Sequence, residues 1–417
     1  MDTKYLFNFC VILLCYAISI DAYIQGNKVL REVLKWKQIS YDFDGVLYNS
    51  DSDTEAPETT KQANISDSEK FFIQYNNVPI GMEVDGDRVF VTVPRRRHGI
   101  PSTLNYVKLS GDPSPALKPY PDRTRSKDFV SVYRPRIDVC RRLWMVDTGH
   151  YEVPGERKQI RPPAIIVYDL NTDQQLFKYE LKPTDLVNER SSAGLTSITV
   201  EVNKDACDDA FAYINDLATE GMVVFSLRAM DSWRLHHRSF VHDTSAMNFT
   251  AAGYLINWTD GLFSIALSDP DSEGRRKAFY HPLVSTQEFA IDTEFLKDKK
   301  KFLGHNTYIG ERGKNTQSGS HDYHAGSRTI FYGNVAQDAI LCWNIDSNMA
   351  PGNIAVVAQD STKLAYVSDL KVIGDELWVL VNQIPKFIYS RFDTNEFNYF
   401  IHRFNIRALI RGTVCEK

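Results

Sequence analysis

Most of this chain lacks long hydrophobic runs, an excess of basic charge and the familiar catalytic motifs. After residue 20 no segment approaches the about 20 consecutive apolar residues that a membrane-spanning helix needs. The formal net charge of −5 excludes the basic surface that nucleic-acid-binding proteins use. Gly-x-Ser-x-Gly, His-Glu-x-x-His and phosphate-loop motifs are absent. We therefore expect a soluble protein with neither a membrane nor a nucleic acid as partner.

The N-terminus carries one short apolar run. Lys4 precedes residues 6–20, which are apolar apart from Asn8 and Ser19, and Ala22 then offers a small-residue exit. This pattern is typical of a cleaved signal peptide, and the run is too short for a membrane anchor. We expect residues 1–22 to be removed and the protein to be secreted. Secretion makes three Asn-x-Ser/Thr sequences candidate glycosylation sites: Asn64, Asn248 and Asn257.

Cysteine is scarce, with six residues in a chain of 417. Two fall within the signal peptide, and an even number in the secreted remainder predicts two disulfides, for which three pairings are possible. The spacings do not resemble a zinc-ligand set, so we expect no metal. The remaining cysteines are Cys140, Cys207, Cys342 and Cys415.

The mature chain divides into a polar arm and a long region of short strands. Residues 23–69 are polar and poorly patterned, whereas residues 70–417 alternate short apolar runs with turns and show no long helical period. With 43% hydrophobic and 24% charged residues, the chain can build a large core.

A strand–turn–strand unit recurs six times in the second region, and each unit has room for about four strands, the size of a β-propeller blade. Stacking such blades around an axis buries both of their apolar faces. Two stacked β-sandwiches would leave the six-fold recurrence unexplained. We therefore predict an all-β, six-bladed propeller. The cores of the six units are residues 80–93, 136–147, 197–216, 263–280, 320–334 and 369–382.

Several segments together resemble the yellow and major royal jelly protein family of arthropods. They span nearly the whole mature chain: residues 140–149 (CRRLWMVDTG), 163–170, 212–217, 231–234, 260–268, 310–313, 342–344 and 412–415. The resemblance implies a secreted six-bladed propeller closed by disulfides. It also implies the pairings Cys140–Cys207 and Cys342–Cys415.

Within that family, residues 280–283, 285–290 and 387–391 are most similar to the dopachrome-converting branch. This implies a cofactor-free dopachrome tautomerase, an isomerase of melanin formation in pigmentation or immune melanisation, acting as a monomer on a small aromatic substrate. The alternative is a non-catalytic extracellular binder of biogenic amines or related aromatic ligands. A third reading is a cuticular or developmental factor without turnover.

Ligands of propellers usually meet the central channel, and amine-binding salivary relatives hold their ligand there. That resemblance implies five ligand-binding positions: Tyr366, Ser368, Asp369, Asn382 and Ile384. Relatives often carry an aromatic residue in place of Ile384, which argues against tight stacking of an amine. For Asp369 and Asn382, capping of turns between strands is an equal alternative.

Dopachrome conversion requires a base that removes a proton from a carbon beside an iminium–quinone system. Histidine suits this task near neutral pH. His150 and His324 lie beside strand ends, and Asp147 ends the buried run 143–146 where it could orient a base. We name these three as candidate catalytic residues, with structural roles at the strand ends as the alternative.

Overall fold

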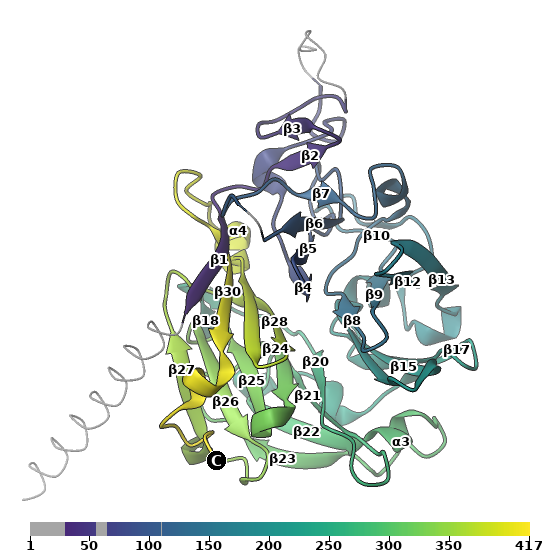
Figure 1. The fold of residues 1–417 in the computed structure, drawn as a ribbon, viewed down its shortest axis with the longest axis vertical. Helices are drawn as coiled ribbons and strands as arrows, with labels where there is room; N and C mark the ends of the chain where they lie inside the picture. Colours follow the sequence, from purple (N-terminus) through teal and green to yellow (C-terminus); the bar gives the residue numbers. More distant parts are fainter. Residues whose placement is uncertain (1–29, 56–64, 110) are drawn as a thin grey trace, which may run out of the picture.

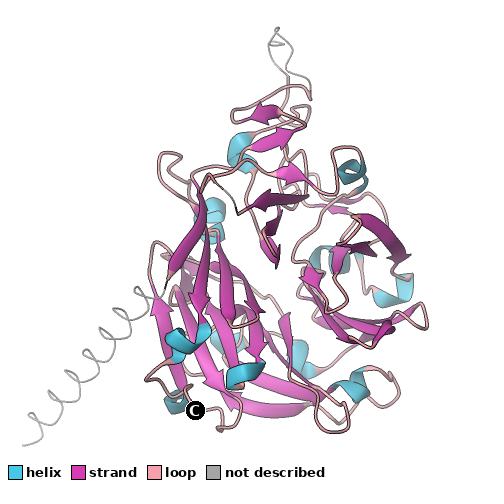
Figure 2. Ribbon diagram, in the orientation of Figure 1, coloured by secondary structure: helices cyan, strands magenta, loops and turns pink. Residues whose placement is uncertain are grey.

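The structure, a computed structural model, describes residues 30–55, 65–109 and 111–417. Six four-stranded antiparallel sheets are set around a common axis (Figure 1), and the few helices are short segments between strands (Figure 2). The predicted all-β six-bladed propeller is confirmed. The predicted signal peptide and the candidate glycosylation site Asn64 lie outside the described residues.

The first three blades follow one another along the chain, each with its first strand at the axis. Blade 1 is β4 (Gly81–Asp85), β5 (Arg88–Thr92), β6 (Leu104–Lys108) and β7 (Lys118–Pro119). Blade 2 is β8 (Arg136–Ile137), β9 (Arg142–Asp147), β12 (Ala164–Asp169) and β13 (Gln174–Glu180). Blade 3 is β14 (Ile198–Asn203), β15 (Ala206–Asp216), β16 (Gly221–Ser226) and β17 (Asp231–Leu235).

The other three blades complete the ring. Blade 4 is β20 (Leu262–Leu267), β21 (Lys277–Pro282), β22 (Gln287–Asp292) and β23 (Thr307–Glu311). Blade 5 is β24 (Ser318–His324), β25 (Thr329–Asn334), β26 (Ala339–Asn344) and β27 (Ile354–Gln359). Blade 6 is β28 (Val367–Ile373), β29 (Glu376–Val381), β30 (Tyr399–Asn405) and β1 (Arg31–Trp36).

Short elements cover the ends of the ring. The two-stranded pairs are β2 (Tyr41–Phe43) with β3 (Val46–Tyr48), β10 (His150–Tyr151) with β11 (Lys158–Gln159), and β18 (Phe249–Ala251) with β19 (Tyr254–Ile256). The helices are α2 (Glu189–Gly194), α3 (Thr293–Leu296), α4 (Ile384–Tyr389) and α5 (Ile406–Ile410). No helix among the described residues is long and apolar enough to cross a membrane.

The middle strands of the blades are apolar without alternation because both of their faces are covered by neighbouring blades. All six residues of β9 are buried. From β9, Trp144 contacts Phe177 of its own blade and Phe225 of blade 3, with ring centroids 5.5 and 6.4 Å apart. Aromatic side chains thus fill the space between adjacent blades.

The N-terminal strand closes the ring. In blade 6, β1 pairs antiparallel with β30, with Arg31 opposite Arg403 and Trp36 opposite Tyr399. Trp36 is buried, and its indole N–H donates to the carbonyl of Pro115 at 2.7 Å. The sequence placed residues 23–69 in a separate arm, whereas residues 31–36 belong to the propeller. The difference arises because β1 pairs with β30, and a local sequence pattern does not reveal a pairing between such distant segments.

Both disulfides join neighbouring parts of the ring, as the family resemblance implied. Cys140, between β8 and β9, is bonded to Cys207 at the start of β15, so blade 2 is tied to blade 3. Cys342 of β26 is bonded to Cys415 near the C-terminus. Of the predicted glycosylation sites, Asn248 and Asn257 are exposed, and their modification remains a prediction.

Candidate functional site

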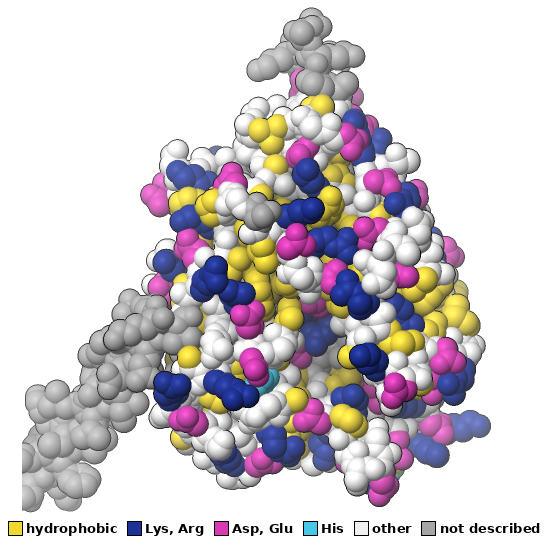
Figure 3. Space-filling view, in the orientation of Figure 1, with side chains coloured by type: hydrophobic (Ala, Val, Ile, Leu, Met, Phe, Trp, Pro, Cys, Tyr) yellow, Lys and Arg dark blue, Asp and Glu magenta, His cyan; other side chains and the backbone are white. Residues whose placement is uncertain are grey.

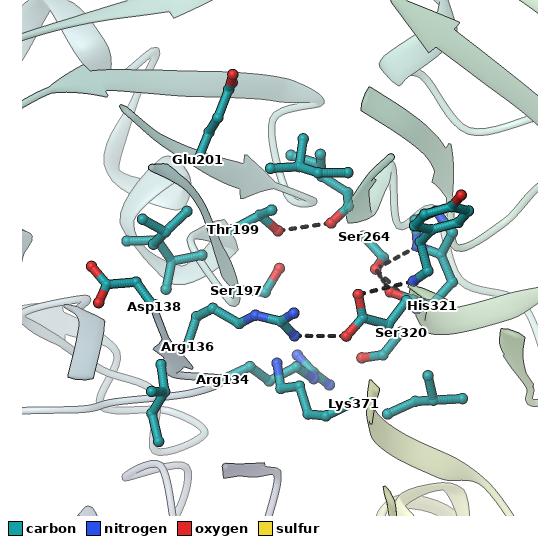
Figure 4. A pocket seen from close by; sticks show the side chains of 18 of the residues that line it. Arg134, Arg136, Asp138, Ser197, Thr199, Glu201, Ser264, Ser320, His321 and Lys371 are labelled. Atoms are coloured by element: carbon teal, nitrogen blue, oxygen red, sulfur yellow. Dashed lines mark hydrogen bonds and ion pairs between the residues drawn. The ribbon is translucent and has the colours of Figure 1, made fainter. Parts of the chain in front are cut away.

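Two cavities lie along the axis, where the innermost strands β4, β8, β14, β20, β24 and β28 meet. The entrance cavity, about 570 Å³, is lined by residues at the beginnings of several of these strands and by residues of the β10–β11 pair, α2 and α4. The axial cavity, about 180 Å³, is lined by residues farther along them (Figure 4). Arg134 lines both. The face seen in Figure 3 is hollowed near the axis, with Lys and Arg side chains around the hollow.

Several of the charged side chains that line the axial cavity are paired with one another. Arg136 forms an ion pair with Asp322 at 2.7 Å, and Lys371 approaches Asp369 at 3.5 Å. Figure 4 shows Arg136 beside its carboxylate partner, with Arg134 and Lys371 on the same side of the cavity. Since these groups satisfy one another, the axial cavity is a poor candidate for ligand binding.

Aromatic side chains from several blades form the walls of the entrance cavity: Tyr133, Trp258, Phe263 and Tyr366. The rings of Trp258 and Tyr366 meet edge to face, with centroids 6.1 Å apart. Such walls suit a flat aromatic ligand.

Arg134 places a positive charge without a partner carboxylate at the floor of this cavity. Its side chain is buried and donates to the carbonyl oxygens of Ser368 at 2.8 Å and Thr196 at 3.3 Å. Its guanidinium carbon lies 4.6 Å from the centroid of the Phe263 ring. Among the described residues no carboxylate forms an ion pair with it. A buried guanidinium of this kind is a ready site for a carboxylate or another anion.

Asp260, just before β20, is one of three acidic residues that line the entrance cavity, together with Glu152 and Glu189. It is half-buried, and its side chain makes no hydrogen bond or ion pair with the described residues. Burial raises the pKa of Asp260 to about 6, although the charges of Arg96, Arg190, His242 and Arg134 oppose this rise. The group is therefore ionised at neutral pH and able to accept a proton.

Glu152, which follows β10, also lines the entrance cavity. The hydroxyl of Tyr133 donates a hydrogen bond to it. Burial raises the pKa of Glu152, with Arg96 and Arg157 acting in the opposite direction. The Tyr133–Glu152 pair thus adds a polar contact next to the aromatic side chains of the wall.

His150, a predicted catalytic residue on β10, also lines the entrance cavity. Its side chain is buried, and its Nδ1 has no hydrogen-bond partner among the described residues. Burial, followed by the charge of Arg157, lowers the pKa of His150. The imidazole is therefore neutral at pH 7, the state that a base requires.

The other two predicted catalytic residues lie elsewhere. Asp147 is buried and accepts hydrogen bonds from the backbone N–H groups of Val130 at 2.9 Å and Ser131 at 2.8 Å. His324, at the far end of β24, contacts the hydroxyl of Ser327 at 2.8 Å and Asp375 at 3.1 Å. Neither residue lines the entrance or the axial cavity. Both residues therefore make structural contacts near strand ends, which was the alternative to a catalytic role in the sequence analysis.

Three of the five predicted ligand-binding residues line the entrance cavity: Tyr366, Ser368 and Ile384. The other two have side chains engaged with the protein. Asp369 accepts from the backbone N–H of Met82 at 3.0 Å, and the amide of Asn382 donates to the carbonyl of Pro79 at 2.8 Å. These contacts tie blade 6 to the start of blade 1.

Sequence reasoning did not single out Arg134, Glu152 or Asp260. Asp260 opens the family segment 260–268, and Glu152 lies two residues after His150, so strand ends could have pointed to both. Nothing in the sequence distinguishes Arg134 from other arginines, because its isolation from carboxylates arises from the fold.

Comparison with known proteins gives consistent matches over almost the full chain. The family model described as "Major royal jelly protein" matches residues 130–415. The L-dopachrome tautomerase yellow-f of Drosophila melanogaster is 37% identical, covering 97% of this chain and 99% of that protein. A dopaminechrome tautomerase of the same organism is 29% identical, covering 95% and 86%. The protein yellow of Drosophila subobscura is 31% identical, covering 97% and 70%.

Proposed function

Because this chain belongs to the major royal jelly protein family, which includes relatives named as tautomerases, we propose that it is a secreted dopachrome tautomerase of melanin formation. Its active site would be the entrance cavity. The observation that carries this proposal is the presence, in one cavity, of aromatic walls, an unpaired guanidinium, a neutral imidazole and a carboxylate that can take a proton.

The proposed reaction needs a base and a clamp. Two bonds to carbon in dopachrome break: one C–H bond, and either a second C–H bond or the bond to the carboxylate, which then leaves as CO₂. Of the two electron pairs released, one forms the new C=C bond of the indole ring and the other reduces the quinone. The two quinone oxygens take up two protons and become hydroxyls. The atoms and electrons balance without an oxidant, so acid–base groups suffice.

Asp260 is the residue that we propose as the base. Its pKa of about 6 leaves it ionised at neutral pH yet basic enough to accept a proton from an acidified carbon. His150, neutral in the same cavity, would receive the second proton when the carboxylate is retained. A simple binder of aromatic amines would need aromatic walls and one carboxylate, and would have no use for an unpartnered imidazole.

Arg134 would hold the substrate carboxylate. The substrate ring would then lie among Phe263, Tyr366 and Trp258, close to Asp260 at the start of β20. This arrangement would fix the position of the reacting carbon relative to the base, which is a major source of rate acceleration in enzymes.

The test is to mix the purified protein with L-dopachrome and follow the loss of its orange absorbance against a heat-treated control. We expect acceleration, with a single dihydroxyindole product identified by chromatography. Binding of dopachrome without acceleration would favour the alternative function, an extracellular carrier of aromatic ligands. Sequencing the mature N-terminus from culture medium tests secretion, and a start near residue 23 is expected.

A further inference from the structure

A second cluster of buried polar side chains lies between blades 4 and 5, outside the entrance cavity. His281 is on β21, Glu288 on β22 and His321 on β24, and all three are buried. His281 Nδ1 lies 3.1 Å from Glu288 Oε2, and His321 Nε2 lies 3.3 Å from Glu288 Oε1. The two imidazole rings meet edge to face with centroids 4.5 Å apart.

The outer nitrogen of each imidazole has a partner that fixes its hydrogen. His281 Nε2 lies 3.1 Å from the carbonyl oxygens of Ser318 and Gly319, and because carbonyls only accept, this nitrogen carries the hydrogen. His321 Nδ1 lies 2.7 Å from the hydroxyl oxygen of Ser264, and that hydroxyl lies 3.3 Å from the carbonyl oxygen of His321, to which it can donate while it accepts from Nδ1. Both outer nitrogens are therefore donors, and both inner nitrogens carry lone pairs.

Three lone-pair atoms consequently converge on one buried spot. His281 Nδ1, His321 Nε2 and Glu288 Oε1 are buried and have no hydrogen-bond partner among the described residues. The ligand atoms of the three side chains all lie within 4.8 Å of one another. Leaving three such atoms unpaired in the interior is costly, so something must satisfy them.

We propose that His281, Glu288 and His321 form a binding site for a divalent transition-metal ion of the zinc class. Two neutral imidazoles and one carboxylate are a common donor set for zinc. Ligands at about 2.1 Å from a tetrahedral zinc ion lie about 3.4 Å apart, close to the 3.3 Å between His321 Nε2 and Glu288 Oε1. Histidines that bind a metal usually donate their other ring N–H to a carbonyl, carboxylate or water, which fixes the orientation of the ring.

Two further side chains refine the identity of the ion. Arg312 forms an ion pair with Glu288 Oε2 at 2.7 Å, which keeps the carboxylate ionised and leaves Oε1 for the metal. The positive charge of Arg312 repels a divalent cation, so the ion must bind its ligands strongly enough to overcome this repulsion. Imidazole nitrogens bind zinc strongly, whereas calcium and magnesium prefer oxygen ligands and are therefore excluded. The ring of Tyr332 lies 5.8 and 5.5 Å from the rings of His281 and His321, and its buried hydroxyl has no hydrogen-bond partner among the described residues, which makes it a candidate for a fourth position.

The ligands are separated by seven and 33 positions in the sequence, so the ring itself assembles the site. An ion there would bridge blade 4 to blade 5. His321 also lines the axial cavity, where Figure 4 shows it beside Ser264, and this gives the ion a route from the channel.

The test measures the metal content of the full secreted chain, purified without a histidine tag and dialysed against zinc. His321→Gln removes one ligand, and His324→Gln, three residues along the same strand, is the matched control. We expect about one zinc per chain in the wild type and in His324→Gln, and loss of that zinc in His321→Gln. Zinc should raise the Tm of the wild type by a few degrees, whereas calcium should not.

A folded wild type that retains no zinc and shows no zinc-dependent Tm shift would overturn the proposal, and a proton shared by His281 and Glu288 would then occupy the cluster. If His321→Gln fails to fold, the wild type is treated with a chelator instead, and its Tm should fall by the few degrees that zinc adds. Neither readout depends on dopachrome turnover, so this proposal stands or falls independently of the proposed enzyme activity.

Discussion

The guanidinium of Arg134 lies over the ring of Phe263, with its central carbon 4.6 Å from the ring centroid. Arg134 belongs to the segment before β8 in blade 2, and Phe263 belongs to β20 in blade 4, so the contact spans the mouth of the channel. It holds a positive charge against an aromatic wall, and no carboxylate of the described residues forms an ion pair with it. The predictions on substrate binding follow from this relationship.

Replacing Arg134 with glutamine should weaken binding of a carboxylated substrate. A hydrogen bond to a charged group contributes about 1.5–3 kcal/mol, so KM for L-dopachrome should rise by roughly 10- to 100-fold. Dopaminechrome, which has no carboxylate, should be affected far less. Arg190 is an exposed cation that lines the same cavity, so Arg190→Gln is the control that shows the effect of losing one positive charge there. Equal losses for both substrates would remove the carboxylate role of Arg134.

The rate should depend on pH through Asp260. The carboxyl group must be ionised to accept a proton, so kcat should rise with pH around a midpoint near 6, the value to which burial raises its pKa. Asp260→Asn should lower kcat by about 10²- to 10⁴-fold and abolish this rise. Asp271→Asn, at an exposed loop, is the control. An unchanged pH profile in Asp260→Asn would rule out Asp260 as the base.

The closing strand should be essential for stability. Trp36→Ala removes a large buried side chain of β1 together with its hydrogen bond to the carbonyl of Pro115, and should cost about 3–5 kcal/mol of unfolding free energy. Leu47→Ala, at an exposed position of β3, should change it little. Denaturant unfolding curves measure both, and similar midpoints for the two variants would contradict this account of ring closure.

The Cys342–Cys415 disulfide should stabilise the ring by constraining the unfolded chain. It closes a loop with a sequence separation of 73 residues, for which the loop-entropy relation gives about 4 kcal/mol. The double variant Cys342→Ala/Cys415→Ala should therefore unfold at a clearly lower denaturant concentration. If the midpoint does not move, the bond contributes no net stability and closure rests on β1.

Acid should destabilise the protein through His402, which is buried in β30. Burial lowers its pKa to about 4, although the Lys363 carbonyl and the charge of Glu32 favour the protonated form. The unfolded chain takes up a proton below about pH 6.5 while the folded chain does not. Stability present above that pH should therefore be lost as pH falls toward 4, by at most about 3 kcal/mol.

His402→Asn should flatten the acid limb of the stability curve, as measured by urea unfolding at a series of pH values. Replacement of the exposed His305 should leave the slope unchanged. The same slope in His402→Asn and wild type would show that other groups dominate acid unfolding.

The fold could be predicted from the sequence because blade strands carry local patterns. The run Leu143 to Val146 is apolar without alternation, and the structure buries it between blades. The pairing of β1 with β30 could not be predicted in this way, since Arg31 and Arg403 meet across almost the whole chain. Local sequence patterns therefore predict the individual strands, whereas ring closure depends on contacts between segments that are distant in the sequence.

The site was only partly predictable for a similar reason. His150, Tyr366, Ser368 and Ile384 follow or begin strands, and all line the entrance cavity. Asp369 and Asn382 occupy equivalent strand ends, yet both bind backbone groups of blade 1. Whether a polar strand end faces a ligand or a neighbouring loop depends on the register between blades, which the sequence does not specify.

The most direct test of the central claim is the rate of L-dopachrome loss with wild-type protein and with the double variant His150→Gln/Asp260→Asn, both shown to be folded by circular dichroism. The entrance cavity accounts for turnover if the wild type accelerates the reaction and the double variant leaves it at the uncatalysed rate. Full activity in the double variant would contradict the claim, and would place the chemistry elsewhere in the protein.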